Sequence, residues 1–106
     1  MPVSFQKRQK KLIACLSGEI DHHSAAPIRR EIDGKIEQDK PEILHLDFSG
    51  VTFMDSSGVG LVMGRYRLMQ PYGGILELGG MSPAVRRIMR LSGIEKIAAV
   101  AERKGK

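Results

Sequence analysis

The chain has 106 residues, 42% of them apolar, which is enough for one compact domain and too few for two. Its net charge of +5 is uneven along the chain. Residues 1–11 hold four basic residues and no acid, residues 12–58 hold four basic and nine acidic, and residues 59–106 hold nine and three. The acidic middle and the aromatic content of 5% argue against nucleic acid as a direct partner, because stacking on bases needs aromatic side chains.

Several other classes of protein are disfavoured by what the sequence lacks. Cys15 is the single cysteine, so neither a disulfide framework nor a cysteine-based zinc site is expected. His22 and His23 are adjacent and point in different directions, and His45 is isolated, so no metal site is predicted. The N-terminus lacks the apolar run of a signal peptide, and no stretch is long enough to span a bilayer. We therefore expect a cytoplasmic protein without a membrane partner.

The first apolar segment, residues 12–16, is predicted to be a buried strand that ends at Ser17 and Gly18. Residues 3–9 are a possible edge partner for this strand. Cys15 within the run is interpreted as a small core residue.

A helix is predicted after the polar loop at residues 21–24. Ser24 is suited to be its N-cap, and Pro27 falls in the first turn, where proline is tolerated. Pro41 marks the end of this helix at the latest. Its buried stripe repeats every four residues and consists of Ile28, Ile32 and Ile36.

A second strand is predicted over residues 43–48, where Leu44, Leu46 and Phe48 share one face. After Ser49-Gly50, residues 51–54 lead into a second helix, which ends by Pro71. The apolar positions of this helix are Val59, Val62, Met63, Tyr66 and Met69.

The last third of the chain predicts a strand over residues 75–78, a helix and a short final strand over residues 97–100, followed by a charged tail over residues 101–106. Ser82 is suited to be the N-cap of the helix and Gly93 its C-cap. The helix is expected to bury Val85, Ile88 and Met89.

The alternation of strands and helices predicts an α/β fold, in which helices pack on a small, mostly parallel or mixed sheet of four to five strands. Loops beyond the carboxyl ends of parallel strands lie at one edge of such a sheet. Asp21 and the turn at residues 55–58 both belong there if the first clear strand is parallel to the second.

The sharpest local feature is the turn at residues 54–60, Met-Asp-Ser-Ser-Gly-Val-Gly. Asp55 is suited to cap the second helix, which places Ser57 among unpaired backbone N–H groups of the first turn. Negative charge is stabilised there, so a phosphate on Ser57 could be held locally. The alternative is a structural role, with the turn as a capped helix start whose glycines allow close packing.

Enzyme motifs do not fit this turn. Neither serine has the flanking glycines of a nucleophile elbow, and the pair Gly58 and Gly60 lacks the third glycine of a dinucleotide fingerprint. No Walker A loop is present, and Asp47 lacks the acidic pair expected of a receiver domain. We therefore expect neither an enzyme nor a bound cofactor, and a phosphate on Ser57 would have to come from ATP held by another protein.

Arginines account for much of the basic charge in the second half of the chain. They form either a solvated helix face or a surface complementary to an acidic protein partner, an alternative that the sequence leaves open. They are Arg65, Arg67, Arg86, Arg87 and Arg90.

Four segments together resemble the anti-sigma factor antagonists, a family of STAS-domain proteins. They are residues 18–24 (Gly-Glu-Ile-Asp-His-His-Ser), 53–61 (containing Met-Asp-Ser-Ser-Gly), 64–66 (Gly-Arg-Tyr) and 82–87 (Ser-Pro-Ala-Val-Arg-Arg). The Asp-His-His loop and Gly-Arg-Tyr point to the sporulation branch, the anti-sigma F factor antagonists of endospore-forming bacteria. The resemblance implies a single STAS domain over residues 1–106, with its core at about 3–100.

This resemblance implies a partner-switching protein. The unphosphorylated form would bind an anti-sigma factor that is also a serine kinase, and so release the sigma factor. The kinase, which supplies ATP and Mg²⁺, would phosphorylate Ser57, and a serine phosphatase would reverse the step. The implied partner-binding residues are Asp21, His22, His23, Asp55, Ser56, Ser57 and Gly58.

An alternative from another class is a STAS-type scaffold or sensor module in which Ser57 is only a structural cap. Family members usually continue into a C-terminal helix, whereas six residues follow Val100 here. Such a helix is expected to be short or frayed.

Overall fold

Five strands form one sheet in which neighbours in space are also neighbours along the chain, in the order β1-β2-β3-β4-β5. The computed structural model describes residues 2–100. Its elements are β1 (Val3–Arg8), β2 (Lys11–Ile20), α1 (His22–Asp39), β3 (Ile43–Met54), α2 (Ser57–Met69), the 3₁₀ helix η1 (Gln70–Tyr72), β4 (Ile75–Gly79), α3 (Pro83–Ser92), the 3₁₀ helix η2 (Ile94–Lys96) and β5 (Ala99–Val100).

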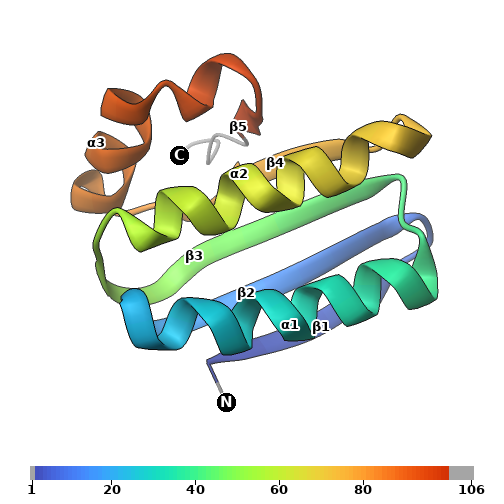
Figure 1. Ribbon diagram of the computed structural model, residues 1–106, viewed down its shortest axis with the longest axis horizontal. Helices are drawn as coiled ribbons and strands as arrows, with labels where there is room; N and C mark the ends of the chain where they lie inside the picture. Colours follow the sequence, from blue (N-terminus) through green and yellow to red (C-terminus); the bar gives the residue numbers. More distant parts are fainter. Residues whose placement is uncertain (1, 101–106) are drawn as a thin grey trace.

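The sheet is mixed, because β1 runs antiparallel to β2 whereas the pairs β2–β3, β3–β4 and β4–β5 are parallel. A helix connects the strands of each parallel pair, as a crossover requires. α1 and α2 lie side by side across one face of the sheet, and α3 lies at the end of the molecule where α1 and α2 begin (Figure 1). The predicted α/β fold with four to five strands is confirmed.

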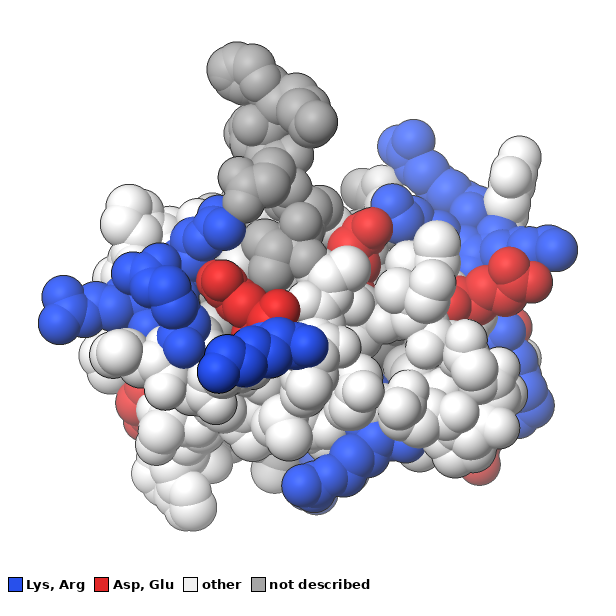
Figure 2. Space-filling view, turned by 90° about the horizontal axis from the view of Figure 1, so that it is seen from above, with Lys and Arg blue, Asp and Glu red and all other residues white. Residues whose placement is uncertain are grey.

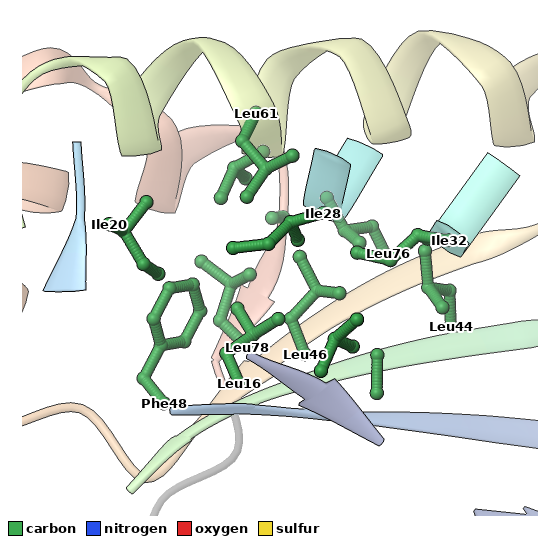
Figure 3. Close-up of a cluster of buried hydrophobic side chains, with 14 of the residues drawn as sticks. Leu16, Ile20, Ile28, Ile32, Leu44, Leu46, Phe48, Leu61, Leu76 and Leu78 are labelled. Carbon is green, nitrogen blue, oxygen red and sulfur yellow. The ribbon is translucent and has the colours of Figure 1, made fainter. Parts of the chain in front are cut away.

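The hydrophobic core lies between this face of the sheet and the helices (Figure 3). The predicted alternation in β3 is confirmed, since Leu44, Leu46 and Phe48 are each at most 1% exposed. Burying such side chains stabilises the fold by about 1.5–3 kcal/mol each. The stripe predicted for α1 is also confirmed, and it consists of Ile28, Ile32 and Ile36.

The opposite face of the sheet carries half-buried side chains of mixed character. His45 Nδ1 lies 2.6 Å from Glu77 Oε1, and Lys11 Nζ lies 3.1 Å from the same oxygen. Burial alone would raise the pKa of Glu77, but its hydrogen bonds with His45 and Lys11 outweigh burial and lower it. Cys15 is half-buried and alternates away from the core, so its predicted core position is wrong.

β2 and β3 are longer than predicted, because they continue past the small residues at 17–18 and 49–50 to end at Ile20 and Met54. At two places in this stretch β3 has one residue more than β2, as in a bulge. Gly18 has a φ of +79°, a left-handed conformation that favours glycine. The small residues therefore mark irregular pairing within long strands and are not strand ends.

α1 begins earlier than predicted. Asp21 is its N-cap in place of Ser24, and Pro27 lies inside the helix beyond the first turn. The missing N–H of Pro27 removes one hydrogen bond near the helix start, which the buried isoleucine stripe offsets. The helix ends at Asp39, before Pro41, as predicted.

The buried face of α2 is only partly the predicted one. Val62 and Met69 are buried as expected, whereas the predicted Val59, Met63 and Tyr66 are only partly buried. Leu61 and Arg65 take their place in the buried face.

The C-terminal third is close to its prediction. Ser82 caps the start of α3, with its Oγ accepting from the Val85 N–H at 3.2 Å, and Gly93 ends it in the left-handed conformation. Val85 and Met89 are buried and Ile88 partly so. The last strand, Ala99–Val100, is shorter than predicted, because the N–H groups of Ile97 and Ala98 both donate to the Ile94 carbonyl oxygen in the turn that follows η2. The predicted tail at 101–106 lies outside the described residues.

Gly80 offers a test of this architecture. Its φ is +67°, and a Cβ there would overlap the Asp47 side chain and lie 2.9 Å from the Ser49 nitrogen. We expect Gly80→Ala to lower the free energy of unfolding in urea by about 1–3 kcal/mol. Gly60→Ala is the control, because nothing lies within 4 Å of its Cβ position and alanine favours helix by up to about 1 kcal/mol. Equal stability of the two variants would contradict this account.

Candidate functional site

α1 and α2 begin at neighbouring positions because β2 and β3 end in register. Ile20 of β2 pairs with Met54 of β3, and the backbone N–H of Asp55 donates to the Ile20 carbonyl oxygen at 3.2 Å. Asp21 and Asp55 are the next residues on the two strands. The prediction that their loops share one edge of the sheet is therefore confirmed.

Asp21 closes the start of α1 through a reciprocal set of hydrogen bonds. Its Oδ1 accepts from the N–H groups of His23 at 2.9 Å and Ser24 at 3.0 Å. In return, the Ser24 hydroxyl accepts from the Asp21 N–H at 2.9 Å and donates to the Glu19 carbonyl at 2.8 Å. The pKa of Asp21 is lowered, chiefly by the hydrogen bond from the Ser24 N–H. The side chain is thus held as a carboxylate at the helix start.

Asp55 holds the start of α2 in a different way. Its Oδ1 accepts from the Ser57 N–H at 2.8 Å, while Ser56 occupies the N-cap position without a side-chain capping bond. The next two N–H groups, of Gly58 and Val59, donate to the carbonyls of Asp55 at 3.0 Å and Ser56 at 3.1 Å. The prediction that Ser57 lies among unpaired N–H groups is therefore wrong, because the turn satisfies them itself. Within residues 2–100 the Ser57 hydroxyl has no hydrogen-bond partner.

Ser57 lines a hollow of about 390 Å³ between the first halves of α1 and α2. One helical stripe from each helix forms it, with spacings i, i+3, i+4 and i+7 on α1 and i, i+3 and i+4 on α2. The lining residues are His22, Ala25, Ala26 and Arg29 of α1 and Ser57, Gly60 and Leu61 of α2.

Of the predicted partner-binding residues, only His22 and Ser57 line this hollow. His23 and Ser56 are exposed outside it. Gly58 is buried, and a Cβ there would overlap a methionine side chain, so this glycine serves close packing at the start of α2.

Of the lining residues that sequence reasoning missed, Arg29 is the one with a charged side chain. It is exposed, and it follows His22 by seven residues, which places both on the same face of α1. This spacing was the available signal, but it becomes informative only once His22 is known to be helical.

An ion pair between Arg65 and Asp33 joins α2 to α1 beyond this hollow. Arg65 Nε lies 2.8 Å from Asp33 Oδ1, without the alignment of a hydrogen bond, and the arginine side chain is 6% exposed. Burial lowers the pKa of Arg65, the Asp33 carboxylate opposes this effect, and the nearby Arg29 adds to it. The prediction that Arg65 lies on a solvated or partner-binding face is therefore wrong.

The remaining arginines stay at the surface. Arg67, Arg87 and Arg90 are exposed, whereas Arg86 Nε lies 3.5 Å from Glu95 Oε2. Figure 2 shows Lys and Arg side chains gathered at the left end of the molecule, where α3 lies, with acidic side chains beside them. Burial of one arginine and pairing of another weaken the nucleic-acid alternative, which needs a continuous basic face.

The histidines and carboxylates do not gather into a larger cluster in the part of the chain that the structure describes. The rings of His22 and His23 meet edge to face at 5.4 Å, and no group of three His, Cys, Asp or Glu residues there could hold a metal ion. Among the same residues, no helix has the length and apolar character to cross a bilayer.

Residues 3–104 match the STAS domain family. An anti-sigma F factor antagonist of Paenibacillus polymyxa is 34% identical over 100 residues, which cover 94% of this chain and 86% of that relative. One of Lysinibacillus sphaericus is 37% identical over 86 residues, which cover 81% and 74%. This chain belongs to the STAS-domain anti-sigma factor antagonists. The resemblance seen in the sequence is confirmed, and the role of the family is regulatory.

Solved structures of this family agree with the fold. The unphosphorylated form of the anti-sigma factor antagonist SpoIIAA matches this antagonist with a TM-score of 0.81 at 33% identity, over 96% of this chain and 90% of that one. The phosphorylated form of the Bacillus cell fate determinant SpoIIAA matches with a TM-score of 0.73 at 32% identity, over 96% and 93%.

The cap of α1 can be tested separately from its charge. Asp21→Ala should lower the melting temperature by several degrees, because two N–H groups lose their acceptor. Asp21→Asn should retain most of the stability near neutral pH, since asparagine also caps helices well. Because the pKa of Asp21 is lowered in the folded state, the stabilisation by its charge is present above the ordinary pKa of 3.8 and is lost as the pH falls through the lowered value. Thermal melts of the three proteins between pH 7 and 3 measure this, and equal melting of Asp21→Ala and wild type would refute it.

The ion pair between the helices should respond asymmetrically to substitution. Asp33→Asn leaves the buried Arg65 without its counter-ion and should cost about 1–3 kcal/mol of unfolding free energy. Arg65→Met should cost less, because the remaining Asp33 side chain is 37% exposed and water can solvate it. Arg67→Met, at an exposed position, should stay within about 0.5 kcal/mol of wild type. Urea unfolding measures these free energies. A larger loss of unfolding free energy for Arg65→Met than for Asp33→Asn would contradict the view that the buried arginine depends on its counter-ion.

Proposed function

We propose that this antagonist is a phosphorylation-controlled partner switch that regulates sporulation transcription in the cytoplasm. In its unphosphorylated form it binds an anti-sigma factor that is also a serine kinase, and the sigma factor is released. Phosphorylation of Ser57 by that kinase switches the binding off, and a serine phosphatase restores it. The observation that carries this proposal is the Ser57 hydroxyl, which lacks a hydrogen-bond partner among residues 2–100 and lines an open hollow at the edge where α1 and α2 begin.

The comparisons support this proposal through the names of the relatives. The relatives from P. polymyxa and L. sphaericus are anti-sigma F factor antagonists, and SpoIIAA has been solved with and without phosphate. The rival function is a STAS-type scaffold in which Ser57 is a structural cap. It is disfavoured because the Asp55 carboxylate, and not the Ser57 hydroxyl, provides the side-chain cap of α2.

The proposed docking surface is the edge formed by the starts of α1 and α2. It combines the His22 ring and the Ser57 hydroxyl in the hollow with the exposed His23 and Ser56 outside it. Asp21 and Asp55 hold the two helix starts, and buried Gly58 keeps α2 close to the end of β3.

Phosphoryl transfer needs little from this chain beyond an accessible hydroxyl. Ser57 Oγ attacks the γ-phosphorus of ATP bound to the kinase, a new P–O bond forms, the bond to the β-phosphate oxygen breaks, and ADP leaves. The hydroxyl proton passes to a base of the kinase or to water. Positioning and charge neutralisation by Mg²⁺ dominate such reactions, and both are supplied by the kinase.

The phosphate would weaken docking by its charge and bulk. It brings about −1.5 to −2 charges to a position whose own N–H is already bound to the Asp55 carboxylate. The phosphate and the nearby Asp55 carboxylate together concentrate negative charge at a packed contact, which disfavours binding of the kinase. A loss of about 2–3 kcal/mol of binding free energy reduces affinity about 30- to 150-fold. The switch therefore requires no refolding.

Substitutions at Ser57 test the proposal. Ser57→Ala should bind the kinase as wild type does and stay bound in the presence of ATP, whereas Ser57→Asp should bind at least about 30-fold more weakly. Ser56→Ala is the matched control and should still be phosphorylated and released. Binding is measured by calorimetry before and after incubation with ATP, and the phosphate is located by peptide mass spectrometry. A phosphate on Ser56, or on neither serine, would disprove the assignment.

A further inference from the structure

We propose that the hollow beside Ser57 is a phosphate-accepting site of the protein itself, in which Arg29, with His22 next to it, holds the phosphate that Ser57 carries. This inference rests on the proposed phosphorylation of Ser57 and adds where the phosphate goes. Arg29 is a positioning residue in this account, because it binds the modified side chain and takes no part in the transfer.

The chemistry of the hollow suits a phosphate monoester. Its charged or chargeable lining groups are Arg29 and His22, and the other residues that line it have neutral side chains or none. No carboxylate is among the lining residues. Its volume of about 390 Å³ is many times the roughly 30 Å³ that one water molecule occupies, so a phosphate group fits. A guanidinium presents paired N–H groups that match phosphate oxygens.

The turn that precedes Ser57 directs the phosphate toward this hollow. The Ser57 N–H is bound to Asp55 Oδ1 at 2.8 Å, so it does not offer the phosphate a free donor. The Asp55 carboxylate also repels a second anion on that side. The side of the hollow is the one with positive charge, because Arg29 lines it together with Ser57.

Arg29 is available for this role. Among residues 2–100 no carboxylate lies within ion-pair distance of it. Its charge lowers the pKa of the buried Arg65, whose own charge is paired with Asp33. A phosphate on Ser57 would give Arg29 its missing counter-ion. The phosphate would then bridge α2 to α1 and occupy part of the hollow that the unphosphorylated protein presents to its partner.

The test uses full-length protein with phosphoserine incorporated at position 57 during synthesis, so that no kinase is required. Phosphorus NMR follows the second ionisation of the phosphate, whose ordinary pKa is about 6. Arg29 favours the dianion and should lower that pKa, so Arg29→Gln should raise it by about 0.5–1 unit. Arg29→Lys keeps the charge and should remain close to wild type.

Arg30→Gln is the matched control. Arg30 is the next residue on α1 and is also exposed, but it lines a different hollow, with Pro27, Glu31, Gly34, Lys35 and Gln38. It should leave the phosphate pKa unchanged. His22 and Asp55 are present in every protein of the series, so their effects cancel in the differences.

Two results would overturn the inference, namely an unchanged phosphate pKa in Arg29→Gln or an equal rise in Arg30→Gln. Thermal melts of the unphosphorylated variants establish that both remain folded, as expected for exposed positions. Failure of a kinase to modify Ser57 would refute the proposed function alone, because the phosphate in this titration is built in.

Discussion

The parallel pairing of β2 with β3 is the constraint on which the rest of this structure depends. This pairing ends at Ile20 and Met54, so β2 and β3 end side by side at the same edge of the sheet. Two helices that start there must lie side by side, and burying one face of the sheet requires them to do so along its whole length. The pairing of the strands therefore sets the position of the site, and Asp21 and Asp55 hold the two helix starts in place there.

The contact between α1 and α2 has a hollow at each end. Small side chains leave the hollow beside Ser57 at the start of the two helices, and a second hollow of about 330 Å³ at their other end is lined in part by Leu68 and Tyr72. The Arg65–Asp33 ion pair lies between the two, and Asp33 itself lines the second hollow. The contact between the two helices thus leaves room beside Ser57, while an ion pair joins the helices farther along. This arrangement suits the proposed partner switch, which requires no refolding.

Periodicity predicted most of the core, because a buried stripe such as Ile28, Ile32 and Ile36 can be recognised from the spacing of residues along the sequence. Contacts between residues that are far apart in the sequence cannot be recognised in this way. Arg65 looked like a surface residue because its counter-ion lies 32 positions earlier in the chain, and burial of a charge depends on that partner. Asp21 and Ser24 both fit the N-cap pattern, and only geometry assigns the two roles. The resemblance to known proteins pointed to Ser57 as the proposed phosphorylation site, whereas Arg29 becomes a candidate only once the position of α2 beside α1 is known.

The irregular pairing between β2 and β3 has a consequence for how the chain can change in length. From the pair Cys15–Asp47 to the pair Ile20–Met54, β2 advances five residues and β3 seven. Strict alternation of faces is lost in this stretch, because Phe48, Val51 and Met54 are all buried at a spacing of three residues. Each irregularity therefore takes up one extra residue of β3, and the strand still returns a side chain to the core after it. A strand built in this way can absorb residues one at a time and still end with Met54 in the core, so the start of α2, and with it Ser57, keeps its place.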